Sequence, residues 1–208
     1  MKKYPVFLVT LYVACELIAN ITAGKMTTVG PLVAPAAIYI FTVSYTLLDL
    51  INRVLGKKEA RRVVKGAFAA NLLLASYMIL AVKLPHPSSW QGQEAFVMTL
   101  GNTPRITLAS LTAYYLSSNI DIIFYQLLKD KAAPWLRVLG SNSVSLLVDT
   151  VVFITLAFGG LMPLLPLIKG QYLIKLGTTV VTIPIIYLTH FLGFEEEGLP
   201  KSEETSCC

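Results

Sequence analysis

Long apolar segments alternate with short polar segments along the whole chain. The apolar segments are each about 20 residues long, enough to cross a hydrocarbon core of ~30 Å as a helix. None has the polar face that helices of a soluble bundle present to water. The pattern therefore predicts an all-α polytopic membrane protein with six transmembrane helices, at approximately Tyr4–Ile21, Pro31–Ile51, Arg62–Val82, Arg105–Leu128, Val138–Phe158 and Tyr172–Leu192. They would form one domain, residues 1–192, followed by a polar acidic tail, residues 193–208.

The composition supports the same class of protein. Of the 208 residues, 55% are hydrophobic and 14% are charged, and the mean hydropathy is +0.65. Soluble domains carry about 25% charged residues. The first apolar run lacks a small-residue cleavage site, so we expect a retained span and not a signal peptide. The net charge of +5 does not indicate nucleic-acid binding, because the positive residues are sorted by membrane side.

That sorting predicts the topology. Twelve of the 17 lysines and arginines fall on one side of the predicted membrane, and the loop Gly56–Arg62 (GKKEARR) is the strongest single signal. By the positive-inside rule both termini face the cytoplasm. The first span then starts inside and the fourth starts outside. If the halves are related they are inverted three-plus-three repeats, for which the similarity of Ser44–Asp49 to Ser143–Asp149 gives thin support.

Between the third and fourth spans lies the longest outside segment, Lys83–Pro104. Pro85, Pro87 and Gly92 predict that it forms no regular helix. Trp90 and Phe96 either dip back as an interfacial plug or belong to an aromatic belt at the outer headgroups. The sequence does not choose between these alternatives.

The cysteines and histidines indicate no metal site. Cys15 lies inside the first span, and Cys207 and Cys208 end the tail, where free thiols are favoured over lipidation. The two histidines are His86 and His190, and there is no CxxC motif or His/Cys cluster. The sequence therefore predicts neither a metal nor a cofactor.

One carboxylate lies in the middle of the fifth span, within GSNSVSLLVDTVVFITLAFGG (Gly140–Gly160). Ser145 lies one helical turn before Asp149 and Asn142 lies two turns before, so all three share a face. A lone carboxylate in hydrocarbon costs about 3 kcal/mol on insertion scales. Asp149 is therefore predicted to point into the protein interior or a wet cavity. A ligand or ion site is favoured over a residue that only ties helices together.

Other spans repeat this pattern. Polar side chains at helical spacing form stripes comprising Tyr12, Glu16 and Asn20; Tyr45, Asp49 and Arg53; Ser110, Tyr114, Ser117, Asp121 and Tyr125; and Lys175, Thr178 and Thr182. Because lipid cannot satisfy these groups, the stripes are predicted to face each other inside the bundle. Serines and threonines commonly serve helix packing. Asp49 and Arg53 fit a purely structural ion pair as well as they fit a functional site. Asp149 and Lys175 are harder to explain as structural pairs, because the sequence shows no charged partner close to either of them.

The sixth span carries a second sign of a substrate path. Pro184 frees a backbone carbonyl, Pro163 and Pro166 precede the span, and broken or kinked helices commonly line such paths. A carboxylate accepts two parallel hydrogen bonds, and the N–H edge of a guanine-like ring offers such a pair. Aromatic side chains could stack on the ring. This chemistry fits a small planar heterocycle without selecting one.

At these residues the chain resembles the queuosine-precursor transporter family, also known as the YhhQ family. The resemblance runs from Asn20 to Tyr187. Its matching pieces are Asn20 with Lys25, Leu47–Val64 (LLDLINRVLGKKEARRVV), Thr103–Ser110 (TPRITLAS), Asp121, Trp135–Arg137 (WLR), Ser143–Gly160, and Lys175 followed by Pro184 and Tyr187. The chain departs from the family pattern at Ser118 and Leu146, where glutamines are common, and at Arg53, where glutamate is common.

The resemblance implies six spans with cytoplasmic termini and uptake of 7-deazaguanine precursors, the 7-cyano and 7-aminomethyl forms, for queuosine in tRNA or for archaeosine in an archaeal source. It also implies that Asp149 and Asp121 line the central path, with Arg105 and Lys175 near its outer side. The predicted substrate-binding residues are Asp149, Asp121, Ser145, Asn142, Lys175, Asn20, Arg105 and Tyr114.

Three classes of function compete on this basis. The first is a secondary transporter that carries a deazaguanine inward, with proton coupling through Asp149 or Asp121 as one mechanism. The second is a substrate-binding membrane subunit of an energised vitamin importer, which suits the size and span count equally well. A membrane enzyme ranks last, because there is no GxSxG, HExxH or paired-acid metal motif. The coupling ion and a homo-oligomeric state stay open.

Overall fold

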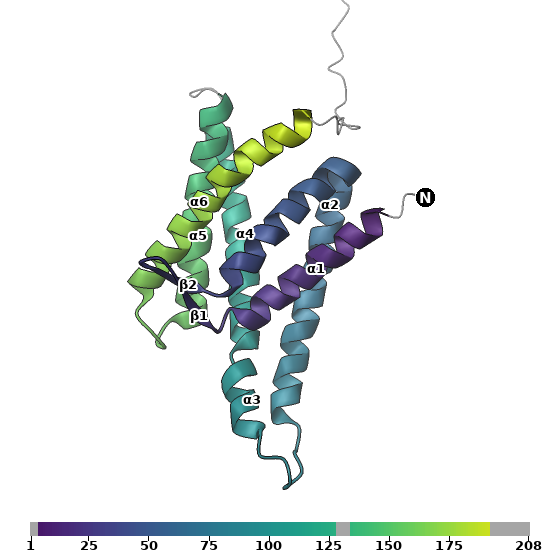
Figure 1. Cartoon of the computed structure of the whole chain (residues 1–208), viewed down its shortest axis with the longest axis vertical. Helices are drawn as coiled ribbons and strands as arrows, with labels where there is room; N and C mark the ends of the chain where they lie inside the picture. Colours follow the sequence, from purple (N-terminus) through teal and green to yellow (C-terminus); the bar gives the residue numbers. More distant parts are fainter. Residues whose placement is uncertain (1–3, 128–133, 192–208) are drawn as a thin grey trace, which may run out of the picture.

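A computed structural model describes residues 4–127 and 134–191 of the chain (Figure 1). The elements in chain order are α1 (Tyr4–Thr22), β1 (Met26–Val29), β2 (Leu32–Pro35), α2 (Ala37–Lys83), α3 (Gln93–Leu100), α4 (Thr103–Leu127), α5 (Pro134–Phe158) and α6 (Leu164–Phe191). The predicted helical class is confirmed over these residues. The tail at residues 193–208, with Cys207 and Cys208, lies outside them, and the domain division stays a prediction.

The helices suit a lipid environment. Among the described residues, three segments are long and apolar enough to cross a membrane: Pro5–Thr22, Lys58–Lys83 and Gly140–Phe158. Large apolar side chains point outward from several helices, with Phe7 65%, Leu73 71% and Leu165 70% exposed. Such outward apolar surface is what hydrocarbon requires of a spanning helix. The number of spans, the side of the termini and the inverted repeat stay predictions.

Gly56 divides α2 into two helical segments, residues 37–55 and 57–83. Its φ of 81° and ψ of 162° lie in a region that is essentially restricted to glycine. The sequence predicted a loop of several residues between Ile51 and Arg62. That boundary is wrong, because the helix continues on both sides and a single glycine makes the bend.

A short antiparallel hairpin precedes α2, where the sequence predicted the second span to begin at Pro31. Met26 pairs with Pro35 and Val29 with Leu32, which leaves a two-residue turn of Gly30 and Pro31. Gly30 has a φ of 59°, as the first central residue of a type II′ turn requires. The predicted start is therefore wrong, and the helix begins only at Ala37.

Two further boundaries differ from the prediction. The segment Lys83–Pro104 contains the helix α3, because its helix breakers end at Gly92 and no proline follows until residue 104. The sixth helix starts at Leu164 and not at Tyr172, because prolines are tolerated in the first turn of a helix. The helix also runs through Pro184 without an interruption.

The segment before α3 packs on itself and against α3. Trp90 makes edge contacts with His86 and Phe96, at ring-centroid distances of 5.9 and 6.3 Å. It remains 43% exposed. These contacts fit both alternatives, the interfacial plug and the aromatic belt, so that question stays open.

The helices approach each other through small side chains. α1 packs mainly along α2, and α4 along α5, as Figure 1 shows. The buried residues at the centre include the alanines 19, 23, 109, 113 and 157. Small residues let helices in lipid come close enough for van der Waals contact, which replaces the hydrophobic driving force available in water.

The hairpin and α6 meet at Gly170. A Cβ atom at this position would lie 2.0 Å from the carbonyl oxygen of Val33 in β2. No side chain fits in that space unless the backbone moves, so the contact sets how α6 lies against the hairpin.

We predict that Gly170→Ala destabilises the fold by displacing α6 from the hairpin. The matched control is Gly177→Ala in the same helix, where a Cβ would meet no atom within 4 Å. That control should be neutral or slightly stabilising, because alanine is favoured over glycine in helices by about 1 kcal/mol. Thermal unfolding midpoints in detergent measure both changes. Equal midpoints for the two variants would contradict the prediction.

Candidate functional site

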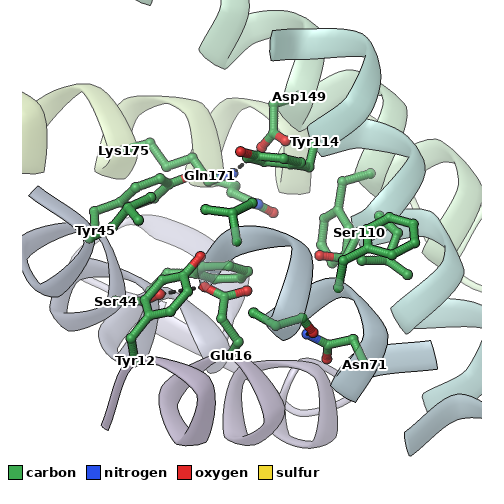
Figure 2. A pocket seen from close by; sticks show the side chains of 17 residues that line it. Tyr12, Glu16, Ser44, Tyr45, Asn71, Ser110, Tyr114, Asp149, Gln171 and Lys175 are labelled. Atoms are coloured by element: carbon green, nitrogen blue, oxygen red, sulfur yellow. Dashed lines mark hydrogen bonds and ion pairs between the residues drawn. The ribbon is translucent and has the colours of Figure 1, made fainter. Parts of the chain in front are cut away.

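A cavity of about 70 Å³ lies at the centre of the helices, with room for several water molecules. α1, both segments of α2, α4, α5 and α6 all contribute to its wall. Figure 2 shows the side chains that surround it. The polar ones are Tyr12, Glu16, Ser44, Tyr45, Asn71, Ser110, Tyr114, Asp149, Gln171 and Lys175. Because the contributing helices are far apart in sequence, the cavity depends on the assembled bundle.

An ion pair crosses one wall of the cavity. Lys175 Nζ on α6 lies 2.5 Å from Asp149 Oδ2 on α5, and the two side chains are 5% and 17% exposed. The ammonium also lies 5.7 Å from the centre of the Phe41 ring on α2, within range of a cation–π interaction. Opposite charges in contact reduce the cost of burying each of them.

Glu16 supplies a second carboxylate to the same cavity. It lies on α1, and the hydroxyl of Ser44 on α2 donates a hydrogen bond to its Oε1. Figure 2 shows Tyr12 beside this contact. Tyr12 is 5% exposed and Ser44 2% exposed. The hydroxyl therefore ties α1 to α2 next to the cavity and partly satisfies the carboxylate.

Amide side chains complete the polar wall. Asn20 Nδ2 donates to Asn71 Oδ1 at 2.7 Å, which joins α1 to the second segment of α2. Gln171 on α6 is 2% exposed, and its Oε1 is buried without a hydrogen-bond partner among the described residues. A buried acceptor without a donor is uncommon in folded proteins. It marks a place where a ligand or a water molecule would be favoured.

Three of the predicted substrate-binding residues lie in the wall of this cavity: Asp149, Lys175 and Tyr114. A fourth, Asn20, contacts it through Asn71. Tyr12, Glu16, Tyr45 and Ser110, from the predicted polar stripes, also line it. The prediction that the stripes of the first, second, fourth and sixth spans face each other is confirmed for these residues.

The other four predicted residues lie elsewhere. Arg105 donates to the Leu156 and Gly159 carbonyls, both at 2.7 Å, and so caps the end of α5. Ser145 donates to the Asn142 carbonyl within α5. Asp121 has a buried oxygen without a partner among the described residues. Their predicted contact with substrate is not tested by this arrangement, and the side chains of the predicted Asp49–Arg53 clasp lie outside the described part of the chain.

The sequence analysis missed several residues of the wall. Gln171 lies one helical turn before Lys175, but it fell outside the span predicted to start at Tyr172. Asn71 carried a signal, since it is an amide within an apolar span. Ser44 and Phe41 were not predicted to contact a ligand. The packing of α2 against α6 brings these four residues to the cavity.

A metal site finds no support in the described residues, where no three His, Cys, Asp or Glu side chains lie together. The expectation that the protein needs no metal or cofactor stays a prediction.

Helices apolar enough to cross a membrane surround this polar cavity, which is the arrangement of a multi-pass membrane protein. The family described as "Putative vitamin uptake transporter" matches residues 35–189. The chain belongs to this family, whose curated relatives are named queuosine precursor transporters.

Two relatives illustrate the similarity. The "Probable queuosine precursor transporter" of Bacillus subtilis (strain 168) is 30% identical over 196 residues, which cover 90% of this chain and 82% of the relative. The "Queuosine precursor transporter" of Escherichia coli (strain K12) is 30% identical over 120 residues, 58% of this chain and 53% of the relative. No solved structure matches the chain.

We predict that Asp149→Asn and Lys175→Met each destabilise the protein by about 3–5 kcal/mol, because each leaves one buried charge without its partner. The double variant should lose less than the sum of the two, since no charge is left alone. The control is the exposed pair Glu59–Arg62 on α2, where the same cycle should give about 0.2–1 kcal/mol. Unfolding in detergent measures both cycles, and equal coupling energies would refute the role of the buried pair.

Proposed function

We propose that this chain carries a queuosine precursor, a 7-substituted 7-deazaguanine, across the cell membrane into the cytoplasm. The names of its relatives support the substrate. The observation that carries the proposal is the central cavity, in which the ion pair Asp149–Lys175 lies among aromatic rings. A bundle with a purely structural interior has no need of a polar chamber at membrane depth.

The wall of the cavity is complementary to such a ring. The ion pair places an ammonium donor and a carboxylate acceptor side by side. A lactam ring presents a carbonyl oxygen next to an N–H, so it offers the opposite pattern of acceptor and donor. Hydrogen bonds to charged groups are worth about 1.5–3 kcal/mol each. The rings of Tyr12, Phe41, Tyr45, Tyr114 and Phe153 line the same cavity and provide faces for stacking.

At about 70 Å³ the cavity is smaller than a bicyclic heterocycle, so we infer that helices separate to admit the substrate. A second cavity of about 590 Å³ adjoins it and reaches Arg61 and Lys65 near the bend of α2. The two cavities share Leu48, Val64, Phe68 and Tyr114 in their walls. We propose that these side chains separate the substrate chamber from an inner exit.

We infer the orientation of the chain in the membrane from charge and shape. The start of α1, the bend in α2 and the end of α6 lie towards one end of the molecule, and the hairpin and α3 lie towards the other (Figure 1). The first end carries the basic cluster Lys58, Arg61, Arg62 and Lys65. The positive-inside rule supports placing this end in the cytoplasm, which puts the inner exit there.

Uptake by proteoliposomes tests the proposal. Purified protein with an inward proton gradient should accumulate labelled 7-aminomethyl- or 7-cyano-7-deazaguanine. Asp149→Asn should reduce the rate about tenfold or more, because one charged hydrogen bond is lost. Gly177→Ala is the control expected to transport normally. Normal uptake by a folded Asp149→Asn variant would remove this residue from the mechanism, and uptake that survives collapse of the gradient would rule out proton coupling.

The same assay distinguishes the proposed transporter from the main alternative. A substrate-binding subunit of an energised importer would bind the deazaguanine but would not move it without partner proteins. Binding without accumulation by the purified chain would therefore favour that alternative over a secondary transporter.

A further inference from the structure

The central cavity holds an uneven set of charges. Of the residues that line it, Glu16 and Asp149 are acidic and Lys175 is basic. Lys175 forms its ion pair with Asp149, and within the described part of the chain Glu16 has no Lys or Arg at ion-pair distance. With both carboxylates ionised, this wall carries two negative charges and one positive charge.

Two acceptors in this cavity have capacity that the fold does not use. The Glu16 carboxylate receives one hydroxyl, from Ser44, although a carboxylate can accept about four hydrogen bonds. Gln171 Oε1 is buried and has no donor among the described residues. Figure 2 shows both side chains at the cavity. In this view Gln171 lies between Asp149 and Glu16. A donor-rich group bound here would satisfy both.

Aromatic rings surround the same place. Tyr12 and Tyr45 line the cavity with Glu16, and the ring of Tyr45 stacks with that of Phe41 at a centroid distance of 6.2 Å. A carboxylate combined with the faces of aromatic rings is the setting in which proteins bind ammonium groups. A neutral donor would satisfy the acceptors, but only a cation would also balance the charge.

We propose that Glu16 and Gln171 form a subsite for a protonated amine on the substrate, separate from the Asp149–Lys175 wall that faces the heterocyclic ring. This inference rests on the proposed function and specifies the class of substrate, a planar lactam heterocycle with a short alkylammonium arm. Glu16 then acts as the residue that determines specificity between cationic and neutral forms of one ring.

Binding of two matched probes tests the subsite. 7-Aminomethyl-7-deazaguanine carries the cation, and 7-cyano-7-deazaguanine has the same ring without it. Wild-type protein should bind the aminomethyl form about ten- to a hundredfold more tightly, as expected for a charged hydrogen bond. Glu16→Gln keeps the size of the side chain and should abolish this preference, with little change for the cyano form. Glu94→Gln on the exposed helix α3 makes the same chemical change away from the cavity and should preserve the preference.

Two further variants keep the test decisive if Glu16→Gln folds poorly. Glu16→Asp retains the charge and should retain a preference for the aminomethyl form. The double variant Glu16→Gln with Gln171→Glu moves the charge to the neighbouring acceptor and should restore the preference. A role limited to the hydrogen bond with Ser44 predicts no restoration.

The outcomes distinguish this subsite from the function on which it rests. Wild-type protein that binds neither probe would overturn the proposed function and the subsite together. Equal affinities of wild-type protein for the two probes would overturn the subsite alone. An equal loss for both probes in Glu16→Gln would also overturn it, because Glu16 would then contact the ring and not the amine.

Discussion

Charges buried at the centre of a membrane protein are costly, and pairing opposite charges reduces that cost, as the Asp149–Lys175 ion pair does here. The pair joins α5 to α6, and the contact of the ammonium with Phe41 extends the link to α2. These helices form one wall of the cavity, while α1 and α4 supply the remainder. Without the pair, each charge would favour an arrangement that exposes it to water, which would destabilise the packing of the helices around the cavity.

The position of Lys175 depends in turn on a contact outside the cavity. Gly170 lies five residues earlier in α6, and its backbone rests against Val33 of the hairpin with no space for a side chain. This contact allows α6 to approach the hairpin closely, five residues before the position at which Lys175 meets Asp149. The hairpin is therefore part of the machinery that positions the site, although none of its residues lines the cavity.

The two ends of the cavity differ in their chemistry. At one wall the charges of Asp149 and Lys175 balance, and at the other Glu16 and Gln171 offer acceptors that the described residues do not fully satisfy. A substrate that carries both a lactam ring and an amine would match both walls at once. Phe68 and Tyr114 are among the residues shared by the two cavities, and we propose that they separate binding from release.

The sequence by itself determined the class of protein and the inward faces of its helices, because burial in lipid rejects polar groups wherever they occur. Helical spacing correctly placed Glu16, Tyr114 and Lys175 on faces that meet. Spacing carries no information on depth, however. The predicted start at Tyr172 placed Lys175 at the beginning of the sixth span. The observed start at Leu164 places it about 12 Å further along the helix, at 1.5 Å per residue. Prolines are tolerated in the first turn of a helix, so the sequence did not locate that start, and only the tertiary structure pairs Lys175 with Asp149 and brings Gln171 to the cavity.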